Sequence, residues 1–415
     1  MIKEIVCIKQ KKTSLTVTNS SISAVLRSNI QKTGIRLYEN GCLGIAGAIG
    51  AYDENKLTQS ARQMLKFKLP YEAMPTADAI GSLDLSGKLT ISDTDFVTAA
   101  KDILSTLRQR YSQFMFSNKI NLIEDQQSLS NDAGTNLVQK DRYLDFTLLI
   151  KHRDSRNLYD GYSAVFTRDL NIEMILQEVA KTCEAYAEKA DFSEAEEKIP
   201  VVMLGGHEFL TKFMTDLEGN TFANNASIFS DQRGEKLFND EFSLLVKRDA
   251  ERTYECFFDG EGTVLPQNRF ALIENGVLKA PYSSKKVAQK YDLPVTGSAI
   301  LDYEMAPVAT PQGMAVEQST KTIKQLLAGR KAILAVIAGG GDFTPQGEFA
   351  SPIQAAYLFD GENYLGRLPQ LSMRSTINQM FGQDFIGASS DGSYPGCPYS
   401  YLALDMYVRK IDDWL

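Results

Sequence analysis

Histidine is scarce in this sequence: only His152 and His207 occur among 415 residues. Imidazole is the commonest side-chain ligand of transition metals, so a site built from three histidines is excluded within one chain. The same two residues are the only imidazole bases available to a serine or cysteine nucleophile, and no G-x-S-x-G motif accompanies them. Acid–base or metal chemistry that relies on imidazole must therefore be built around one of two positions.

Long apolar runs and paired cysteines are also lacking. No uninterrupted apolar stretch approaches the ~20 residues that cross a bilayer, and the first residues do not resemble a secretory leader. The five cysteines are odd in number, far apart and without a C-x-x-C pair: Cys7, Cys42, Cys183, Cys256 and Cys397. Such spacing is typical of free thiols in a reducing compartment. We therefore expect a soluble, cytoplasmic protein with no membrane partner.

Basic residues are in the minority. Lys and Arg (44) are fewer than Asp and Glu (52), which gives a net charge of −8, and no basic run is longer than two residues. A protein that binds the nucleic-acid backbone needs a surplus of cations to displace counterions. The sequence therefore predicts no nucleic-acid partner.

The first 191 residues mix helical and strand-like periodicity without a regular βαβ alternation. Asn40-Gly41 predicts a tight turn in a hairpin over 34–48, because both positions tolerate a positive φ. Ser92 is a candidate N-cap, with Asp95 as its capping-box partner, for a helix whose apolar stripe runs to Tyr111. A second helix is expected over 171–190 and strands over 119–124, 143–151 and 161–167.

A polar stretch, residues 192–198, is the predicted linker between an N-terminal α+β domain (1–191) and a β-rich C-terminal domain (199–415). In the second domain, hairpins are expected over 270–280 and 355–365, and strands over 201–204 and 332–338. Helical insertions are expected over 285–291, 319–328 and 374–380. The predicted fold class is α+β, an N-terminal α/β domain with antiparallel strands followed by a β-rich domain with helical insertions.

His207-Glu208 follows the Gly205-Gly206 pair and is expected in the first turn of a helix. In metallopeptidase helices such a pair begins H-E-x-x-H or H-E-x-x-x-H, where two imidazoles bind the metal and Glu activates water. Here the second ligand position holds Thr211 or Lys212, and an ammonium repels a metal. His207 and Glu208 are therefore candidate catalytic residues, or alternatively a capping or solvent-facing pair. No metal ligand set is predicted in this chain.

Three glycines followed by Asp and Phe come directly after the apolar strand 332–338. The spacing of Gly339, Gly340, Gly341, Asp342 and Phe343 matches neither nucleotide-binding glycine motif. Glycine at such a position removes a side chain where another backbone must approach closely. We predict that residues 339–343 bind an extended peptide by main-chain pairing, and the alternative is that they only turn a surface loop.

The order of several short motifs resembles the TldD/PmbA family, also labelled modulators of DNA gyrase. The motifs are G-I-R-L at 34–37, G-I-A at 44–46, F-D-G-E-G at 258–262, L-I-E-N-G-V-L at 272–278, T-G-S-A at 296–299, G-D-F at 341–343 and a hairpin turn at 360–361. Each motif alone is common, but their order and spacing extend from about residue 34 to the C-terminus.

The resemblance implies two subunits that pair around an enclosed peptide-binding cleft. In a TldD-type subunit, H-E-x-x-x-H and a cysteine near the C-terminus hold a catalytic metal, whereas a PmbA-type (TldE) subunit lacks this motif. This chain departs from the TldD pattern at Lys212, and the surroundings of Cys397 differ from those of the TldD cysteine. The resemblance therefore favours the PmbA/TldE-like subunit.

The functional hypothesis is a cytoplasmic metallopeptidase system that processes leader or unfolded peptides, in which this chain has no metal of its own. Zinc or iron is expected in a TldD-like metal-bearing partner, and a homodimer is the other expected assembly. Two alternatives stay open: a stand-alone metallopeptidase with an unidentified metal site, and a regulator of DNA gyrase.

Overall fold

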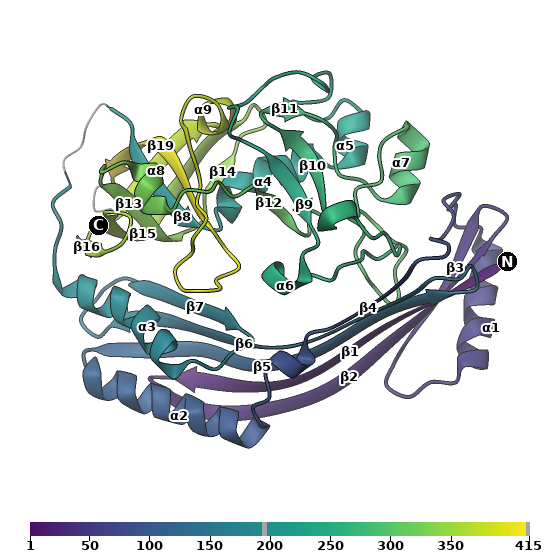
Figure 1. Ribbon diagram of the computed structural model, residues 1–415, viewed down its shortest axis with the longest axis horizontal. Helices are drawn as coiled ribbons and strands as arrows, with labels where there is room; N and C mark the ends of the chain where they lie inside the picture. The colour runs from purple at the N-terminus through teal and green to yellow at the C-terminus, as the bar shows by residue number, and fades with distance from the viewer. Residues whose placement is uncertain (193–196, 412–415) are drawn as a thin grey trace.

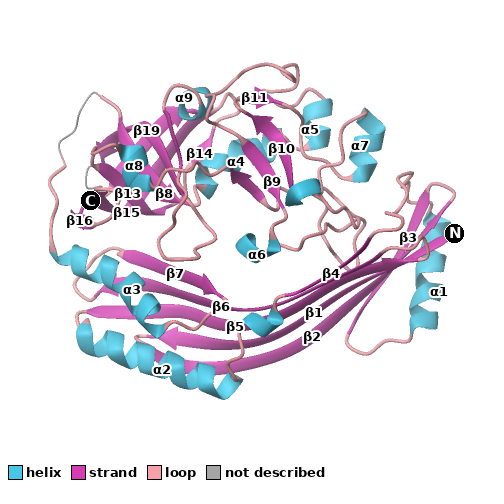
Figure 2. Cartoon of the chain, in the orientation of Figure 1, coloured by secondary structure: helices cyan, strands magenta, loops and turns pink. Residues whose placement is uncertain are grey.

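The computed structural model describes residues 1–192 and 197–411. A long twisted sheet from the first half of the chain lies along one side of the molecule, and the elements from residue 199 onward pack over it (Figure 1). Strands predominate in both halves, and the helices are mostly short (Figure 2). The predicted α+β fold class is confirmed.

The first sheet has seven strands in the order β3-β2-β1-β5-β6-β4, with β7 also paired to β6. Its members are β1 (Ile2–Thr18), β2 (Ser21–Glu39), β3 (Cys42–Ile49), β4 (Ile80–Asp84), β5 (Phe114–Asn131), β6 (Asn136–His152) and β7 (Gly161–Thr167). Neighbours pair antiparallel except β4, which lies parallel to the first part of β6. The four longest strands therefore form a continuous floor beneath the second half of the chain.

Three helices belong to this half: α1 (Glu54–Met64), α2 (Asp93–Arg110) and α3 (Ile172–Ala187). The Ser92 hydroxyl accepts the Asp95 N–H at 3.1 Å and so caps α2, as the sequence predicts. Apolar side chains of α2 and α3 form one core with the strands, Phe96, Ile103 and Val179 being fully buried. The helices thus cover one face of the sheet and leave the other to the second half of the chain.

The second sheet closes into a ring of strands. β13, β8, β19, β17 and β15 are neighbours in turn, and β15 also pairs with β13. Its strands are β8 (Ile199–Leu204), β13 (Ala332–Ala338), β14 (Asp342–Phe343), β15 (Glu348–Phe359), β16 (Tyr364–Arg367), β17 (Leu371–Thr376), β18 (Phe385–Ala388) and β19 (Tyr401–Lys410). β8 and β13 are parallel and the other pairs are antiparallel. The second half is accordingly built on a ring of strands around an apolar core.

A small sheet, β11-β10-β9-β12, extends the second half beside this ring. Its strands are β9 (Leu244–Lys247), β10 (Arg269–Glu274), β11 (Val277–Leu278) and β12 (Met314–Val316). The helices of this half are α4 (His207–Asp216), α5 (Gly219–Ala223), α6 (Ala250–Thr253), α7 (Lys285–Tyr291), α8 (Ile323–Leu327) and α9 (Ile377–Phe381). Among the described residues, no helix is long and apolar enough to cross a membrane.

Local predictions agree with these elements to different degrees. Hairpin turns lie at Asn40-Gly41 and Asn275-Gly276, where all four residues have positive φ angles. The helix expected over 319–328 is wrong in length: it begins only at Ile323, where Thr322 and Gln325 make the capping box. The helix expected over 374–380 is wrong at its start, because residues 374–376 complete β17 and Thr376 is the N-cap.

Two further differences concern the first half. The helix expected over 171–190 begins at Ile172 and ends at Ala187. The first 33 residues, for which no element is predicted, form β1 and most of β2. The predicted linker 192–198 contains residues 193–196, which lie outside the described residues, so the domain division 1–191 and 199–415 stays a prediction.

Candidate functional site

Helix α4 carries both candidate catalytic residues and begins directly after a left-handed turn. Gly205 and Gly206 have φ angles of +75° and +59°. A Cβ on Gly206 would lie 2.5 Å from the Leu402 side chain of β19, so glycine is required there by both conformation and space. The turn connects the end of β8 to the start of α4 and places His207 at the first helical position.

The two candidate residues are not buried on α4. The His207 side chain is exposed and Glu208 is half-buried, whereas the opposite stripe of the helix, including Phe209 and Phe213, is fully buried. An exposed imidazole at a helix start agrees with the solvent-facing alternative as well as with a catalytic role.

Lys212 occupies the position of the second histidine in H-E-x-x-x-H, and its ammonium is paired. Nζ lies 2.9 Å from Oδ1 of Asp216, with side chains only 11% and 3% exposed. The other Asp216 oxygen accepts the Ile228 N–H at 3.0 Å. The face of α4 that would hold a metal between residues 207 and 212 therefore carries a cation already compensated within the helix.

The glycine cluster is a bulge within a hairpin. β13 and β14 both pair antiparallel with β15, and residues 339–341 interrupt them opposite Ser351. A Cβ on Gly341 would lie 2.2 Å from the Ser351 Cβ, so that glycine is needed for close approach. A Cβ on Gly339 or Gly340 would meet nothing within 4 Å. The first two glycines thus leave open space, while the third closes the hairpin.

The structure brings the two predicted groups together across more than a hundred residues of sequence. Helix α4 contacts β14, which contains Asp342 and Phe343. The rings of Phe209 and Phe349 pack edge to face with centroids 5.7 Å apart, and Phe343 stacks obliquely on Phe349 at 4.7 Å. Helix α4 and the hairpin that carries the glycine bulge therefore share a buried aromatic contact.

The loop that carries Cys397 lies beside the same turn. The Gly205 N–H donates to the Ser400 carbonyl at 2.8 Å, and a Cβ on Gly205 would lie 3.5 Å from the Tyr399 ring. Burial raises the pKa of the Cys397 thiol, whose sulfur lies 3.9 Å from the Ser393 hydroxyl. A catalytic or metal-bound cysteine needs its thiolate, so this environment favours a packed thiol.

The family-implied metal can be tested against these residues. In residues 1–192 and 197–411, no three His, Cys, Asp or Glu side chains come together as a metal site requires. At position 212, where a second metal ligand would be needed, α4 carries the ammonium of Lys212. The carboxylate of Asp216, one turn later, is paired with that ammonium. The side chains on α4 therefore do not fit a metal ion.

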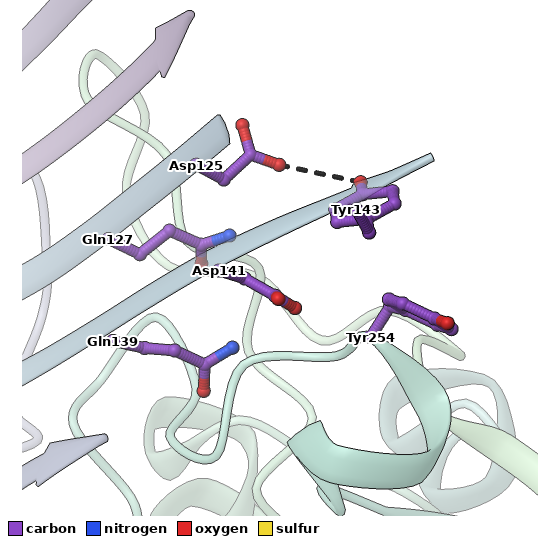
Figure 3. A pocket seen from close by; sticks show the side chains of 6 residues that line it. All are labelled: Asp125, Gln127, Gln139, Asp141, Tyr143 and Tyr254. Carbon is purple, nitrogen blue, oxygen red and sulfur yellow. Dashed lines mark hydrogen bonds between the residues drawn. The ribbon is translucent and has the colours of Figure 1, made fainter. Parts of the chain in front are cut away.

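A small pocket missing from the sequence predictions lies where the two halves meet (Figure 3). It is lined by Asp125, Gln127, Gln139, Asp141, Tyr143 and Tyr254.

Arg168 lies beside this pocket and contacts two of its lining residues. It donates to both Asp141 oxygens at 2.6 and 2.7 Å, and its guanidinium lies 4.1 Å over the Tyr254 ring. It also donates to the Ala250 carbonyl of α6 at 2.7 Å. One arginine therefore joins the floor of the first sheet to the second half of the chain.

The family model described as the PmbA/TldA metallopeptidase C-terminal domain matches residues 198–402. The chain belongs to the TldD/PmbA family. The matched range contains α4, the glycine bulge and the Cys397 loop, so all the candidate residues lie inside the family's C-terminal domain.

Solved structures share the overall fold of this chain. TldE from Thermococcus kodakarensis superposes with a TM-score of 0.81 at 17% identity, covering 99% of this chain and 97% of that one. A candidate modulator of a DNA gyrase from Thermotoga maritima gives a TM-score of 0.76 at 16% identity, covering 98% and 96%. At such identities the likeness shows a shared fold.

A sequence relative extends over most of the chain. An uncharacterized protein from Methanocaldococcus jannaschii is 20% identical over 367 residues, which are 86% of this chain and 84% of that protein. The likeness therefore includes both halves rather than the matched C-terminal domain alone.

In this TldD/PmbA protein, the motifs that carry the resemblance build the joint between the two halves. Arg36 of β2 donates to the Gly260 carbonyl at 2.6 Å, to the Asp302 carbonyl at 2.9 Å and to Glu4 at 3.1 Å. A Cβ on Gly260 would lie 1.8 Å from the Ile300 carbonyl oxygen, so only glycine fits. The G-I-R-L and D-G-E-G motifs are thus two sides of one contact.

Glu261 of the same motif is a buried carboxyl at this joint. Its oxygens accept from the Tyr71 hydroxyl and from the Lys285 N–H. Burial, and next the charge of Asp259, raise the pKa of Glu261 to about 7. Asp259 is itself fixed by the N–H groups of Glu261 and Ala299, which ties D-G-E-G to T-G-S-A. We call this set of contacts around Arg36, Gly260 and Glu261 the signature joint.

Proposed function

We propose that this chain is the PmbA/TldE-like subunit of a cytoplasmic TldD/PmbA-type metallopeptidase system that processes leader or unfolded peptides. In this proposal it supplies no catalytic metal, and zinc or iron is held by a TldD-like partner subunit. The observation that carries the proposal is the Lys212–Asp216 ion pair at the helix position where a second metal ligand is needed.

The physical reason is electrostatic. A dication placed between His207 and residue 212 would meet an ammonium at short range, and in a partly buried setting such repulsion is weakly screened. Releasing Lys212 would also leave the buried Asp216 without its cation, which is costly. His207, which is exposed, and Glu208, which is half-buried, then remain without the second ligand that their metal chemistry requires.

We also propose that residues 339–343 hold an extended peptide. Gly339 and Gly340 leave room for another backbone, and the Gly339 carbonyl already accepts the Gln354 amide at 2.8 Å. Main-chain pairing to such a bulge and to β14 would depend little on side-chain identity. That property suits a system that accepts unfolded polypeptides of varied sequence.

The test is reconstitution with a TldD-type chain whose H-E-x-x-x-H motif is intact, assayed on an unstructured peptide. Glu208→Gln should leave turnover nearly unchanged, because Glu208 is not the base. Gly339→Val should slow cleavage by crowding the open space, and Gly340→Val should do so with added backbone strain, since its φ is +83°. Gly87→Val is the matched control, because a Cβ there also meets nothing within 4 Å and lies far from α4 in sequence.

The subunit roles would be reversed by the opposite result: loss of turnover with Glu208→Gln and no effect of either glycine change. An independent readout is the metal content of the chain purified alone. One equivalent of zinc or iron per chain that disappears in His207→Ala would support the stand-alone metallopeptidase instead.

A further inference from the structure

Four aromatic rings gather between the first sheet and the turn that starts α4. Phe166 lies directly opposite Asp145 across β7 and β6, so the two side chains share one face of the sheet. The ring centroids of Tyr254 and Tyr399, both from the second half, lie 6.4 and 6.1 Å from that of Phe166. Tyr143, two residues before Asp145 on the same face of β6, lies 4.9 Å from Tyr254 (Figure 3). We call Tyr143, Phe166, Tyr254 and Tyr399 the aromatic box.

The protein itself covers this box only in part. Tyr399 is 48% exposed, and Tyr162, on the same face of β7 as Phe166, is 39% exposed. Tyr254 also has a φ angle of +60°, which a bulky side chain rarely adopts. Such backbone strain persists only where the surrounding structure holds it, and it is frequent at ligand sites. The rings therefore form an accessible surface as well as a contact between the two halves.

The acids beside the box are bonded mainly to neutral groups. The Asp145 carboxylate accepts the Asn121 amide at 2.9 Å and the Thr147 hydroxyl at 2.6 Å. Glu255, the residue after Tyr254, has only the Arg248 guanidinium at 3.9 Å, which is longer than a hydrogen bond. The surface around the box is accordingly rich in negative charge, and its charge complements a cation.

One end of the box already holds a cation from the chain itself. The Arg168 guanidinium lies 4.1 Å over the Tyr254 ring and pairs with Asp141. At the other end, burial raises the pKa of the Tyr399 hydroxyl, and neighbouring acids such as Asp145 raise it further. An aromatic face beside an acid is therefore filled by a guanidinium at Tyr254, whereas the corresponding face at Tyr399 is exposed.

We propose that the aromatic box and Asp145 bind a basic side chain, lysine or arginine, of the extended peptide. In the proposed function, on which this rests, residues 339–343 hold the peptide backbone, and the box selects among its side chains. A cation placed here combines attraction to the ring faces with attraction to the carboxylate. An apolar side chain gains only the ring contacts and removes water from Asp145 without replacing it.

The box lies close to the candidate site. The Tyr399 ring is 3.5 Å from the position of a Cβ on Gly205, in the turn that starts α4. β7, which carries Phe166, contacts β13, and β13 leads directly into Gly339. A peptide that extends from the glycine bulge along β7 therefore passes the box, so its basic residue lies away from the bulge itself.

The test measures binding to the purified full chain by fluorescence anisotropy. The probes are labelled, unstructured peptides with flanks of glycine and serine that differ only in one central residue: lysine, arginine, glutamine or leucine. The native chain should bind the lysine and arginine peptides about fivefold or more tightly than the other two. This preference should shrink at high salt, because part of it is attraction between charges.

Two variants locate the preference in the box. Asp145→Asn keeps groups that bond to Asn121 and Thr147 but removes the charge, so the preference for a basic residue should fall below about twofold. Tyr399→Leu keeps an apolar side chain without a ring face and should lower the preference about threefold. Circular dichroism spectra check that both variants are folded.

Asp102→Asn is the matched control for net charge. The chain carries a net charge of −8, which attracts any basic peptide. Asp102 is exposed on α2, and α2 packs on the opposite face of the first sheet, so this variant removes one charge far from the box. It should leave the preference unchanged.

The outcomes separate this proposal from the proposed function. Equal binding of all four peptides overturns the role of the box and leaves peptide binding in place, as does tighter binding of the leucine peptide. Equal effects of Asp145→Asn and Asp102→Asn also overturn it, because the preference would then come from net charge alone. If the native chain binds none of the four peptides, the proposed peptide-binding role fails as well.

Discussion

Two buried polar regions of the molecule differ in what they are built to do. On α4, Lys212 and Asp216 lie one turn apart and neutralise each other, and the neighbouring His207 is exposed. At the signature joint, Arg36 and Glu4 are almost completely buried, at 1% and 0% exposure, and Arg36 also binds two carbonyl groups of the other half. The first region is local to one helix, whereas the second ties distant parts of the chain together.

The difference shows which function the recognisable motifs serve. The D-G-E-G, T-G-S-A and G-I-R-L motifs converge on the joint, where glycines permit close backbone contact and buried polar groups satisfy one another. The region expected to carry chemistry, α4, instead contains the departure from the family's metal pattern. Sequence resemblance in this chain therefore reports architecture more directly than it reports catalysis.

Breaking the joint at its ion pair should have the largest effect. Arg36→Met leaves the buried Glu4 carboxylate without its cation, and we expect a loss of about 4 kcal/mol in the free energy of unfolding. Urea denaturation measures this loss. Lys279→Met is the control, because its pair with Glu274 is about half exposed and should be worth less than about 1 kcal/mol. Similar losses in the two variants would contradict the expected difference between a buried ion pair and a half-exposed one.

Gly260→Ala tests the close approach at the same joint. The added Cβ would lie 1.8 Å from the Ile300 carbonyl oxygen, so the backbone of one side must shift. We expect a loss of about 3 kcal/mol in the free energy of unfolding. Gly87→Ala, whose Cβ meets nothing within 4 Å, should change stability by no more than about 0.5 kcal/mol. A tolerated Gly260→Ala would show that the backbones of Gly260 and Ile300 are not in tight contact.

Glu261 makes the joint sensitive to pH. Its pKa is about 7 in the folded protein, above the ordinary value of 4.5, so folding favours the protonated form. The stabilisation is complete below pH 4.5 and is lost as pH rises through 7, by up to about 3 kcal/mol. Urea denaturation at pH 5 and pH 8 should show a smaller loss for Glu261→Gln than for the native chain. Equal losses in the two proteins would place the carboxyl in an ordinary, solvated environment.

Lys212→Met removes the cation of the α4 ion pair, and of these four changes it should have the smallest effect on the free energy of unfolding. It leaves Asp216 with the Ile228 N–H but without its cation, and we expect a loss of about 2 kcal/mol. Lys236→Met is a matched control, because its i,i+4 partner Asp240 is exposed and the pair is screened by water. If the two changes cost the same, the Lys212 ammonium is not held by burial, and its position would be open to a ligand.

Local features were predictable from sequence because a few neighbouring residues decide them. Asn40-Gly41 and Asn275-Gly276 form turns whatever the strands on either side pair with, and the Ser92 hydroxyl caps α2 by accepting the N–H of Asp95, three residues later. The hairpin of β1 and β2 escaped prediction because its turn, Asn19-Ser20, lacks glycine although both residues have positive φ angles. The run of Lys and Gln at residues 9–12 also hides the strand alternation.

The candidate site was predictable only in pieces. The sequence indicates that α4 follows the Gly205-Gly206 turn, and that residues 339–343 interrupt a strand. Their contact depends on how the ring of strands closes, which no short-range pattern contains. The bridge from Asp141 through Arg168 to Tyr254 was missed for the same reason, since its members are far apart in sequence and individually ordinary.

The place of β19 has a consequence for how the protein is made. This strand, Tyr401–Lys410, is near the end of the chain, yet it lies between β8 and β17 within the ring. All strands of the first sheet are complete by Thr167 and pair among themselves, so they can fold while the ribosome is still translating. The ring cannot close until β19 has been synthesised, and β8 and β17 stay without their shared neighbour until then. A nascent chain stalled before residue 401 should therefore protect the first sheet from protease and leave the second half open to cleavage.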